Sequence, residues 1–275
     1  MLKIYWNRFV NNKLAIISSI FILLLLVIAV FSPVLVKYDP FTQNLSERLL
    51  PPSGSHVFGT DDLGRDVFSR IVYGTRISLS VGIIAVGISI IIGIVLGLIS
   101  GYFRGIVDTV IMRFVDVMLC FPTFFLLLMV IAFLEPNIYN VMIVIGITSW
   151  PGITRLVRGE VISIAEREYI QSTKIAGIST SRILFVHILP NVIGPIIVNM
   201  TLGIGNAILA ESALSFLGLG VQPPVPSWGN ILTAGKDYIH LAWWLSVYPG
   251  LAIFITVLIF NLLGEGLRDI FDPKL

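Results

Sequence analysis

Seven long stretches of the sequence lack Asp, Glu, Lys and Arg and are rich in Leu, Ile, Val and Phe. An α-helix rises about 1.5 Å per residue, so about 20 such residues cross the hydrocarbon core of a bilayer. Each stretch is therefore a candidate membrane-spanning helix. The stretches are Leu14–Val36, Ile77–Phe103, Val117–Leu134, Pro136–Thr154, Ile183–Ala210, Ser212–Gly235 and Tyr238–Gly264.

Prolines interrupt the sixth of these stretches. Pro223, Pro224 and Pro226 have no backbone N–H to donate, and their rings clash with the preceding helical turn. In lipid such a break leaves backbone groups unsatisfied. We therefore predict that 212–237 is a loop or a re-entrant segment, and that the chain is an all-α membrane protein with about six transmembrane helices. We expect three parts, namely a tail with the first helix (1–36), an outer segment (37–76) and a five-helix core (77–275).

Lysine and arginine indicate the orientation, because they favour cytoplasmic loops. A cytoplasmic N-terminus puts six basic residues outside, namely Lys37, Arg48, Arg65, Arg70, Arg76 and Lys236. It puts twelve inside, namely Lys3, Arg8, Lys13, Arg104, Arg113, Arg155, Arg158, Arg167, Lys174, Arg182, Arg268 and Lys274. We therefore predict that both termini are cytoplasmic.

The composition supports a membrane protein. Hydrophobic residues make up 56% of the chain and charged residues 12%, whereas soluble domains carry about 25% charged residues. Most of the surface must therefore face lipid or partner helices. The single cysteine, Cys120, excludes a disulfide framework and a cysteine-based metal site. Because it lies in an apolar stretch, we expect it to be buried.

Motifs for bond chemistry are missing from the sequence. It contains no G-x-x-x-x-G-K-[ST] loop for nucleotide phosphates, no H-E-x-x-H and no G-x-S-x-G. His56, His187 and His240 lie far apart in the sequence. We therefore predict no catalytic residue, no bound metal or cofactor and no nucleic-acid partner.

Glu211 is the one carboxylate between two long apolar runs. A residue in this setting is a candidate functional site by default. The alternative is a carboxylate at the outer end of a helix, which reaches water or pairs with a loop arginine. Ion-coupled transporters usually need several buried carboxylates or broken helices near mid-membrane, so the sequence argues against that class.

Glycines mark one face of the second span. Gly93, Gly97 and Gly101 follow one another at intervals of four residues. Small residues at this spacing let a second helix approach closely. We favour packing within the chain over a contact between subunits.

The segment Arg158–Asn191 predicts a helix, a turn and a second helix on the cytoplasmic side, between the fourth and fifth spans. Gly177 sits where a helix C-terminus favours positive φ, and Ser179, Thr180 and Ser181 can cap a new helix. Such an element suits docking to a partner better than a solvated loop does. Small or apolar residues follow one helical face, at Val161, Ala165, Tyr169, Thr173 and Ala176.

This segment resembles the EAA loop of importer permeases in the ABC superfamily. That pattern runs E-A-A, three residues, glycine, nine residues and I-x-L-P. Gly177 and Leu189-Pro190 match in register, whereas the triplet is Gln171-Ser172-Thr173 and His187 replaces the isoleucine. The resemblance implies a cytoplasmic coupling loop, 158–182, that contacts ATPases. The implied residues are Gln171, Ser172, Thr173, Lys174, Ala176, Gly177, Ile178, Ser179, Leu189 and Pro190.

Longer blocks sharpen the resemblance. FGTDDLGRDVFSRIVYGTRISLSVG (58–82), ESALSFLGLGVQPPVPSWGNIL (211–232) and the ending GLRDIFDPKL resemble the C-type permease subunit of the dipeptide/oligopeptide/nickel importer family. The resemblance implies a multi-pass protein of a prokaryotic cell membrane. Its implied partners are a second homologous permease, two subunits that bind ATP–Mg, and an extracytoplasmic solute-binding protein. Contacts with that protein or with the pathway are implied for Asp61, Asp62, Arg65, Asp66, Glu211, Pro223 and Trp228.

In this scheme the chain is a permease without catalytic activity of its own, and ATP is hydrolysed on partner subunits. We favour di- and oligopeptides as the solute. The alternative is nickel or a metal chelate, because members of the family for either solute share these blocks. Two other classes stay open, namely an ion-coupled secondary transporter and a structural or enzymatic membrane protein.

Overall fold

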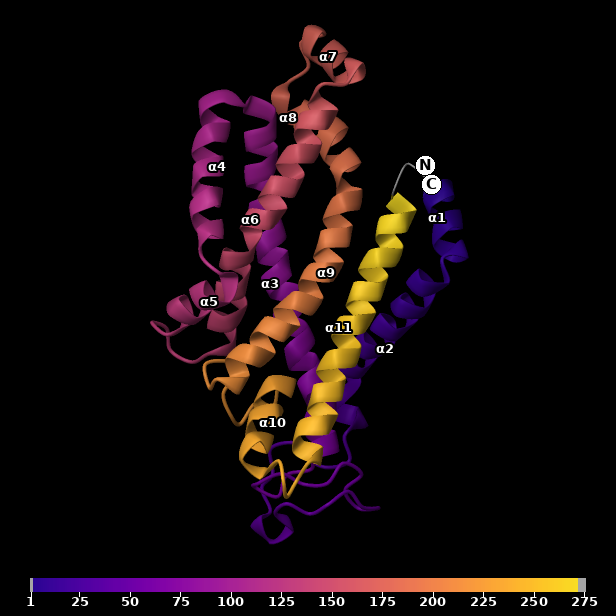
Figure 1. The fold of residues 1–275 in the computed structure, drawn as a ribbon. Helices are drawn as coiled ribbons and strands as arrows, with labels where there is room; N and C mark the ends of the chain where they lie inside the picture. The colour runs from indigo at the N-terminus through magenta and orange to yellow at the C-terminus, as the bar shows by residue number, and fades with distance from the viewer. Residues whose placement is uncertain (1, 272–275) are drawn as a thin grey trace.

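The computed structural model describes residues 2–271, and this part of the chain folds into helices without a named strand (Figure 1). Short 3₁₀ turns lie at Leu45–Glu47 and Lys236–Tyr238, and a π-helix spans Ile183–Ile188. The α-helices are α1 Leu2–Asn11, α2 Lys13–Leu35, α3 Val67–Phe103, α4 Gly105–Cys120, α5 Thr123–Ile131, α6 Ile138–Ala165, α7 Glu168–Ile175, α8 Thr180–Arg182, α9 Leu189–Phe216, α10 Trp228–Gly235 and α11 Trp244–Phe271.

Within the described residues, five helices are long and apolar enough to cross a membrane. They are α2, α3, α6, α11 and the continuous run 180–216, and the bent pair α4–α5 gives up to six spans. The prediction of about six membrane helices is confirmed. The prediction of one continuous helix from Val117 to Leu134 is wrong, because α4 and α5 meet at 85°. Pro122 disfavours helical geometry at Phe121, which is extended.

Several predicted boundaries move because charged residues lie inside helices. The helix expected to start at Ile77 starts at Val67, and the one expected to end at Thr154 ends at Ala165. Arg155 and Arg158 stay helical because they pair with acidic groups of α4, namely Asp116 and Asp108. Cys120, expected to be buried, is exposed at the end of α4. The last four residues of GLRDIFDPKL, 272–275, lie outside the described residues.

The glycine face of α3 packs against α6 of the same chain. A Cβ added at Gly93 would lie 2.6 Å from Ile153, one at Gly97 2.6 Å from Val157, and one at Gly101 2.8 Å from Val161. The two backbones therefore approach as closely as glycine allows. The preference for packing within the chain is confirmed, and this contact forms the centre of the bundle.

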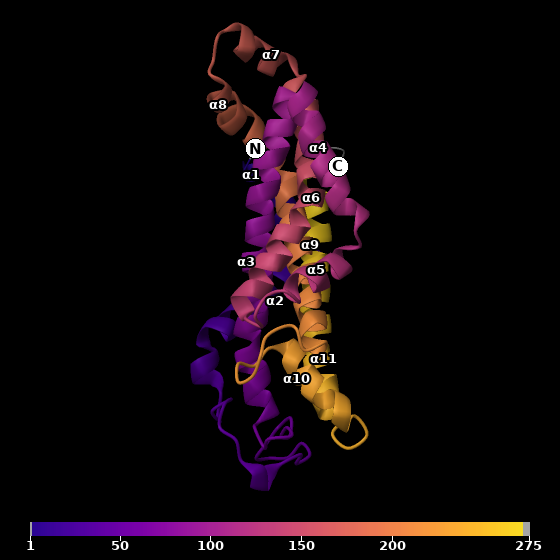
Figure 2. The same ribbon diagram turned by 90° about the vertical axis from the view of Figure 1, so that its left-hand side faces the viewer.

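The molecule is elongated, and its two ends differ (Figures 1 and 2). Helices α7 and α8 project from one end, which we call the inner end after the predicted orientation. The segment 37–66 covers the opposite end, which we call the outer end, beside α10 and the start of α11. Helix α1 and the end of α11 lie nearer to the inner end.

Candidate functional site

The predicted coupling segment, which we define as 166–182 and call the coupling segment below, turns sharply away from α6. Arg167 is extended (φ −67°, ψ 142°), and α7 begins after it. The single amphipathic helix predicted from Val161 to Ala176 is therefore wrong, and the loop begins at Glu166 rather than at residue 158. Val161 is buried in α6, whereas Tyr169 is exposed and Ile170 points inward. The small and apolar residues do recur at helical spacing, but the extended backbone of Arg167 turns the residues after it onto a different face.

Gly177 makes the predicted turn. Its φ is +73°, its N–H donates to the carbonyl of Lys174 (3.0 Å), and the N–H of Ile178 donates to that of Thr173 (3.2 Å). This is the Schellman pattern of hydrogen bonds. A helix restarts at Thr180, as predicted, but the side chain of Ser179 makes no capping hydrogen bond.

The polar side chains of α7 contact α7 itself and the ends of α6 and α3. Gln171 Nε2 donates to the carbonyl of Ala165 (2.7 Å), and Thr173 Oγ1 donates to that of Ile170 (2.7 Å). Lys174 Nζ lies 4.9 Å from the ring centroid of Tyr102. Their exposed neighbour Ile175 is 88% accessible. Sequence reasoning missed Ile175, although an apolar residue between Lys174 and Ala176 is a signal for a partner contact.

A π-helix links the coupling segment to the bundle. Ile183, Leu184 and Ile188 are buried, which anchors it, while Leu189 is half-buried and Pro190 is exposed. The π-helix, whose turns are wider than those of an α-helix, ends just before Pro190. Pro190 has no N–H to donate to the backbone hydrogen bonds of the preceding turn. The sequence match at Leu189-Pro190 therefore lies where the chain enters α9.

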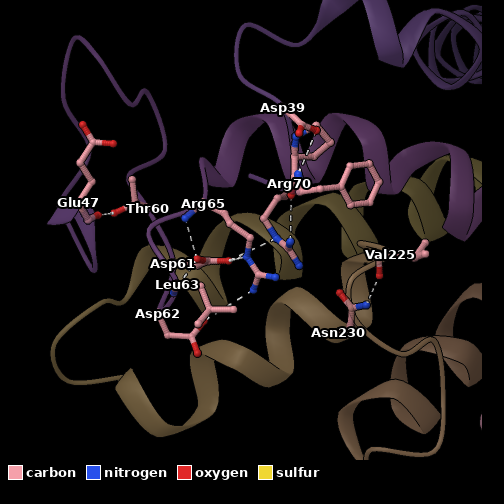
Figure 3. Close-up of polar contacts among 12 residues, drawn as sticks. Asp39, Glu47, Thr60, Asp61, Asp62, Leu63, Arg65, Arg70, Val225 and Asn230 are labelled. Carbon is pink, nitrogen blue, oxygen red and sulfur yellow. Dashed lines mark hydrogen bonds and ion pairs between the residues drawn. The ribbon is translucent and has the colours of Figure 1, made fainter. Parts of the chain in front are cut away.

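At the outer end, Asp61, Arg65 and Arg70 form a buried charged cluster (Figure 3). Asp61 Oδ2 lies 2.7 Å from Arg65 Nε and 3.4 Å from Arg70 Nε. Asp61 Oδ1 accepts hydrogen bonds from the N–H groups of Leu63 and Arg65, both at 2.9 Å. Asp62, also predicted as a contact residue, lies 3.8 Å from Arg65 and has a side chain that is 29% exposed.

Asp66 fixes the segment 37–66 to the start of α3. Its Oδ2 accepts the N–H of Ser69 (2.8 Å) and so caps the helix. Its Oδ1 lies 2.9 Å from His56 Nδ1. The ring centroids of His56 and Tyr38 lie 4.8 Å apart, with the rings tilted by 32°. Asp66 is therefore buried beneath the outer surface.

The proline-rich loop folds back onto α3 and contains no helix across Pro223–Pro226, as predicted. Trp228 is buried, and its Nε1 donates to the carbonyl of Ile71 at 3.1 Å. Ser227 and Asn230 form a capping box at the start of α10. Pro223 remains exposed. We call the contact between 37–66 and this loop with α10 the outer seam.

Glu211 is fully buried, and serine hydroxyls surround its carboxylate. Ser215 and Ser227 donate to Oε1 at 2.7 and 2.9 Å, and Ser212 lies 3.5 Å from Oε2. The alternative in which Glu211 reaches water or pairs with a loop arginine is wrong for this structure. Hydrogen bonds compensate the buried carboxylate in place of a cation, and they tie α9 to the start of α10.

A central cavity of about 450 Å³ lies at the break between α4 and α5 and reaches α3, α6 and α9. Its polar lining consists of hydroxyls and amides, including Ser89, Thr123, Ser149, Asn199 and Asn206. Asn199, Gly203 and Asn206 recur on one face of α9, at three- or four-residue spacing. This surface can hydrogen-bond a polar solute inside an otherwise apolar bundle.

A second cavity, which we call the inner cavity, lies next to the first. It has about 440 Å³, shares Asn199 and Leu202 with the central cavity, and includes Glu160 and Arg268. Together the two cavities run between α6 and α9. Across residues 2–271, no group of three His, Cys, Asp or Glu side chains is placed to hold a metal ion.

Sequence reasoning missed Asn199 and Asn206, because it considered only charged residues inside the spans. The signal was present, since an amide within an apolar helix needs a polar environment. Their spacing alone does not say whether they face a cavity or a neighbouring helix.

Two family models match the chain. Binding-protein-dependent transport system inner membrane components match residues 93–275, and the N-terminal TM domain of oligopeptide transport permease C matches residues 1–52. The chain is 48% identical to the dipeptide transport system permease protein DppC of Alkalihalophilus pseudofirmus, over 96% of this chain and 87% of the relative. It is 44% identical to the di/tripeptide transport system permease protein DppC of Pseudomonas aeruginosa, over 100% of this chain and 92% of the relative.

Among solved structures, a chain from inward-facing conformations of the MetNI methionine ABC transporter has the same fold. The TM-score is 0.58 at 17% identity, and the match covers 74% of this chain and 97% of that chain.

Proposed function

The chain belongs to the family of binding-protein-dependent transport system inner membrane components, and from this premise we propose that it is a permease subunit of an ATP-driven importer of short peptides. A second, homologous permease supplies the other half of the pathway. Two ATPase subunits bind at the coupling segment, and a solute-binding protein docks at the outer end.

The central cavity is the observation that carries this proposal. It lies at a helix break in the middle of the bundle and shares Asn199 and Leu202 with the inner cavity. Hydroxyl and amide groups on its wall match the donors and acceptors of a peptide backbone. A short peptide can therefore exchange hydrogen bonds with water for hydrogen bonds with the wall as it passes.

The chain performs no bond chemistry in this mechanism. ATP–Mg binds to the partner ATPases, and its hydrolysis shifts the helices between two packings. Coupling requires that the contact at α7 differ in free energy between the two states. The projecting α7, with Ile175 exposed, supports this role.

Peptides are preferred over nickel because the two relatives above are named for dipeptides and di/tripeptides. Uptake of both solutes into vesicles that contain the whole importer decides between them. Peptide uptake that requires ATP and the binding protein is the expected result. Nickel uptake without peptide uptake contradicts the peptide assignment, and uptake without ATPases contradicts the importer itself.

Asn206→Leu tests the pathway directly. It removes an amide from the central cavity, so we expect slower peptide uptake per ATP hydrolysed. Asn261→Leu on α11 is the matched control, because Asn261 is exposed and lines neither cavity. Equal uptake by the two variants contradicts the assignment of this cavity to the pathway.

Cysteine labelling tests the orientation. With Cys120 replaced by Ser, single cysteines at Ser53 and Ser179 should react with an impermeant reagent from opposite sides of the membrane. Both positions are exposed, and their segments lie at opposite ends of the bundle (Figure 1). Labelling of both from one side contradicts the predicted topology.

A further inference from the structure

The charged cluster of the outer seam contains more buried positive than buried negative charge. Arg65 and Arg70 are 5% and 2% exposed, and they share one buried carboxylate, that of Asp61. Asp62 also lies near Arg65, but its side chain is 29% exposed, and its Oδ1, which is buried without a hydrogen-bond partner, stays 3.8 Å from Arg65 Nη2. Buried cations are normally matched by anions, so the cluster can accept another carboxylate.

The two guanidinium groups also keep unused donors. Each has five N–H groups, but Arg65 uses Nε on Asp61, and Arg70 uses Nη1 on the carbonyl of Pro40. Among their nitrogens, Arg70 Nε is the one that is both buried and without a hydrogen-bond partner. Both guanidinium groups therefore keep donors that no hydrogen bond occupies.

Both arginines line a cavity of about 260 Å³, which we call the outer pocket. Its other walls come from the proline-rich loop and α10, including Gln222, Pro223 and Ala234. It shares no lining residue with the central or the inner cavity. The outer pocket is therefore separate from the two cavities that we assign to the solute.

We propose that the outer pocket receives the carboxylate of one Asp or Glu side chain of the solute-binding protein. This inference rests on the proposed function, which places that protein at the outer end. The volume suits a single side chain, and a guanidinium pair binds a carboxylate with directed, charge-assisted hydrogen bonds. Docking then places the binding protein across the outer seam, where the two loops meet.

Charge changes at the rim test the proposal and leave both arginines intact. Asp62→Asn removes a charge that competes for Arg65. Ala234→Glu adds one on the opposite wall, and Ala234→Gln has nearly the same size without the charge. Asp62 and Ala234 are half-buried, which limits the structural effect of each change.

The measurement is the ATPase rate of the reconstituted importer as a function of the concentration of peptide-loaded binding protein. Relative to wild type, we expect the half-saturating concentration to fall about threefold for Asp62→Asn. Relative to Ala234→Gln, it should rise about threefold for Ala234→Glu. Both shifts should shrink in about 0.5 M salt, because rim charges are screened. Two shifts in the same direction, or none, overturn the proposal, because a purely structural cluster has no reason to respond with opposite signs.

A second arm identifies the source of the carboxylate. Acidic residues of the binding protein are changed to Asn or Gln one at a time, and each change is combined with Asp62→Asn in a double-mutant cycle. The residue whose replacement cancels the effect of Asp62→Asn is the occupant of the outer pocket. Peptides with an amidated C-terminus provide the comparison. If they cancel the effect while no acidic residue does, the carboxylate belongs to the peptide and the proposal is wrong. Wild-type vesicles without ATP-dependent uptake would instead reject the proposed function.

Discussion

The two ends of the molecule contain the same turn in different surroundings. At the inner end, Gly177 has a φ of +73°, and at the outer end Gly218 has a φ of +79°. Both close a helix with the Schellman pair of hydrogen bonds, and a Cβ at either position would meet no atom within 4 Å. After Gly177 the chain enters an exposed segment, whereas after Gly218 it enters a loop held by Trp228 and a capping box.

The difference lies in how much each end stabilises itself. The outer end buries Asp61, Arg65, Glu211 and Trp228 and satisfies most of their polar atoms within the chain. In α7 only Ile170 is buried, and Ile175 faces outward. A self-stabilised end keeps its shape before a partner arrives. The inner end has little packing of its own, so under the proposed function we expect its geometry to depend on the ATPases.

The largest effect is expected at the outer seam, for Asp61→Asn. This change leaves Arg65 and Arg70 buried without their shared carboxylate, which should lower the unfolding free energy by about 3–5 kcal/mol. Thermal unfolding in detergent, followed by tryptophan fluorescence, measures the loss. Glu166→Gln at the inner end is the control, because its pair with Arg104 is about half exposed and should be worth less than about 1 kcal/mol. Equal losses would contradict the contrast between the ends.

Gly177→Val should separate stability from function at the inner end. The left-handed backbone there strains a β-branched residue by about 1–2 kcal/mol, too little to unfold the bundle. The protein should insert and pair with its permease partner. Peptide uptake should fall sharply, with ATPase activity uncoupled or the ATPases detached.

The control for this change is Gly105→Val, in another turn that has positive φ (+56°) and free space around the Cβ. Uptake and ATPase rates in reconstituted vesicles, with a pull-down of the ATPases, compare the two variants. Coupled uptake by Gly177→Val at the wild-type rate would remove the coupling segment from the mechanism.

Helix caps offer a smaller test of the same contrast. Ser227→Ala removes the cap of α10 and one hydrogen bond to Glu211, so we expect a loss of about 1–2 kcal/mol. Ser179→Ala should change stability little, since its side chain makes no capping hydrogen bond. Denaturant unfolding of both variants checks this, and a larger loss for Ser179→Ala would reverse the comparison.

The smallest effect is expected for Lys174→Glu. The exposed cation lies over the ring of Tyr102, and a contact of this kind contributes about 0.5–1 kcal/mol. Unfolding should shift slightly and peptide uptake should fall less than for Gly177→Val. Loss of uptake as complete as in the glycine variant would show that the charge of α7, rather than its turn, carries the coupling.

Local features of the sequence predicted local structure well. The turn at Gly177, the interruption at Pro223–Pro226 and the first span near Leu14–Val36 all follow from properties of consecutive residues. Errors arose where a helix continues through charged residues or bends without a change in composition. Arg158 lies inside α6 and pairs with Asp108 of α4, and Pro122 bends the chain within an apolar run.

The sequence by itself determined that the chain is an all-α membrane protein, that Pro223–Pro226 interrupts a helix and that Gly177 makes a turn. Helix length, proline and glycine act through neighbouring residues, so a single chain reveals them. Only the tertiary structure decided that Asp61, Arg65 and Arg70 share one buried site, that Ser227 reaches Glu211, and that Asn199 and Asn206 face a common cavity. These contacts join separate elements, and their geometry depends on how the helices pack, which no short stretch of sequence encodes.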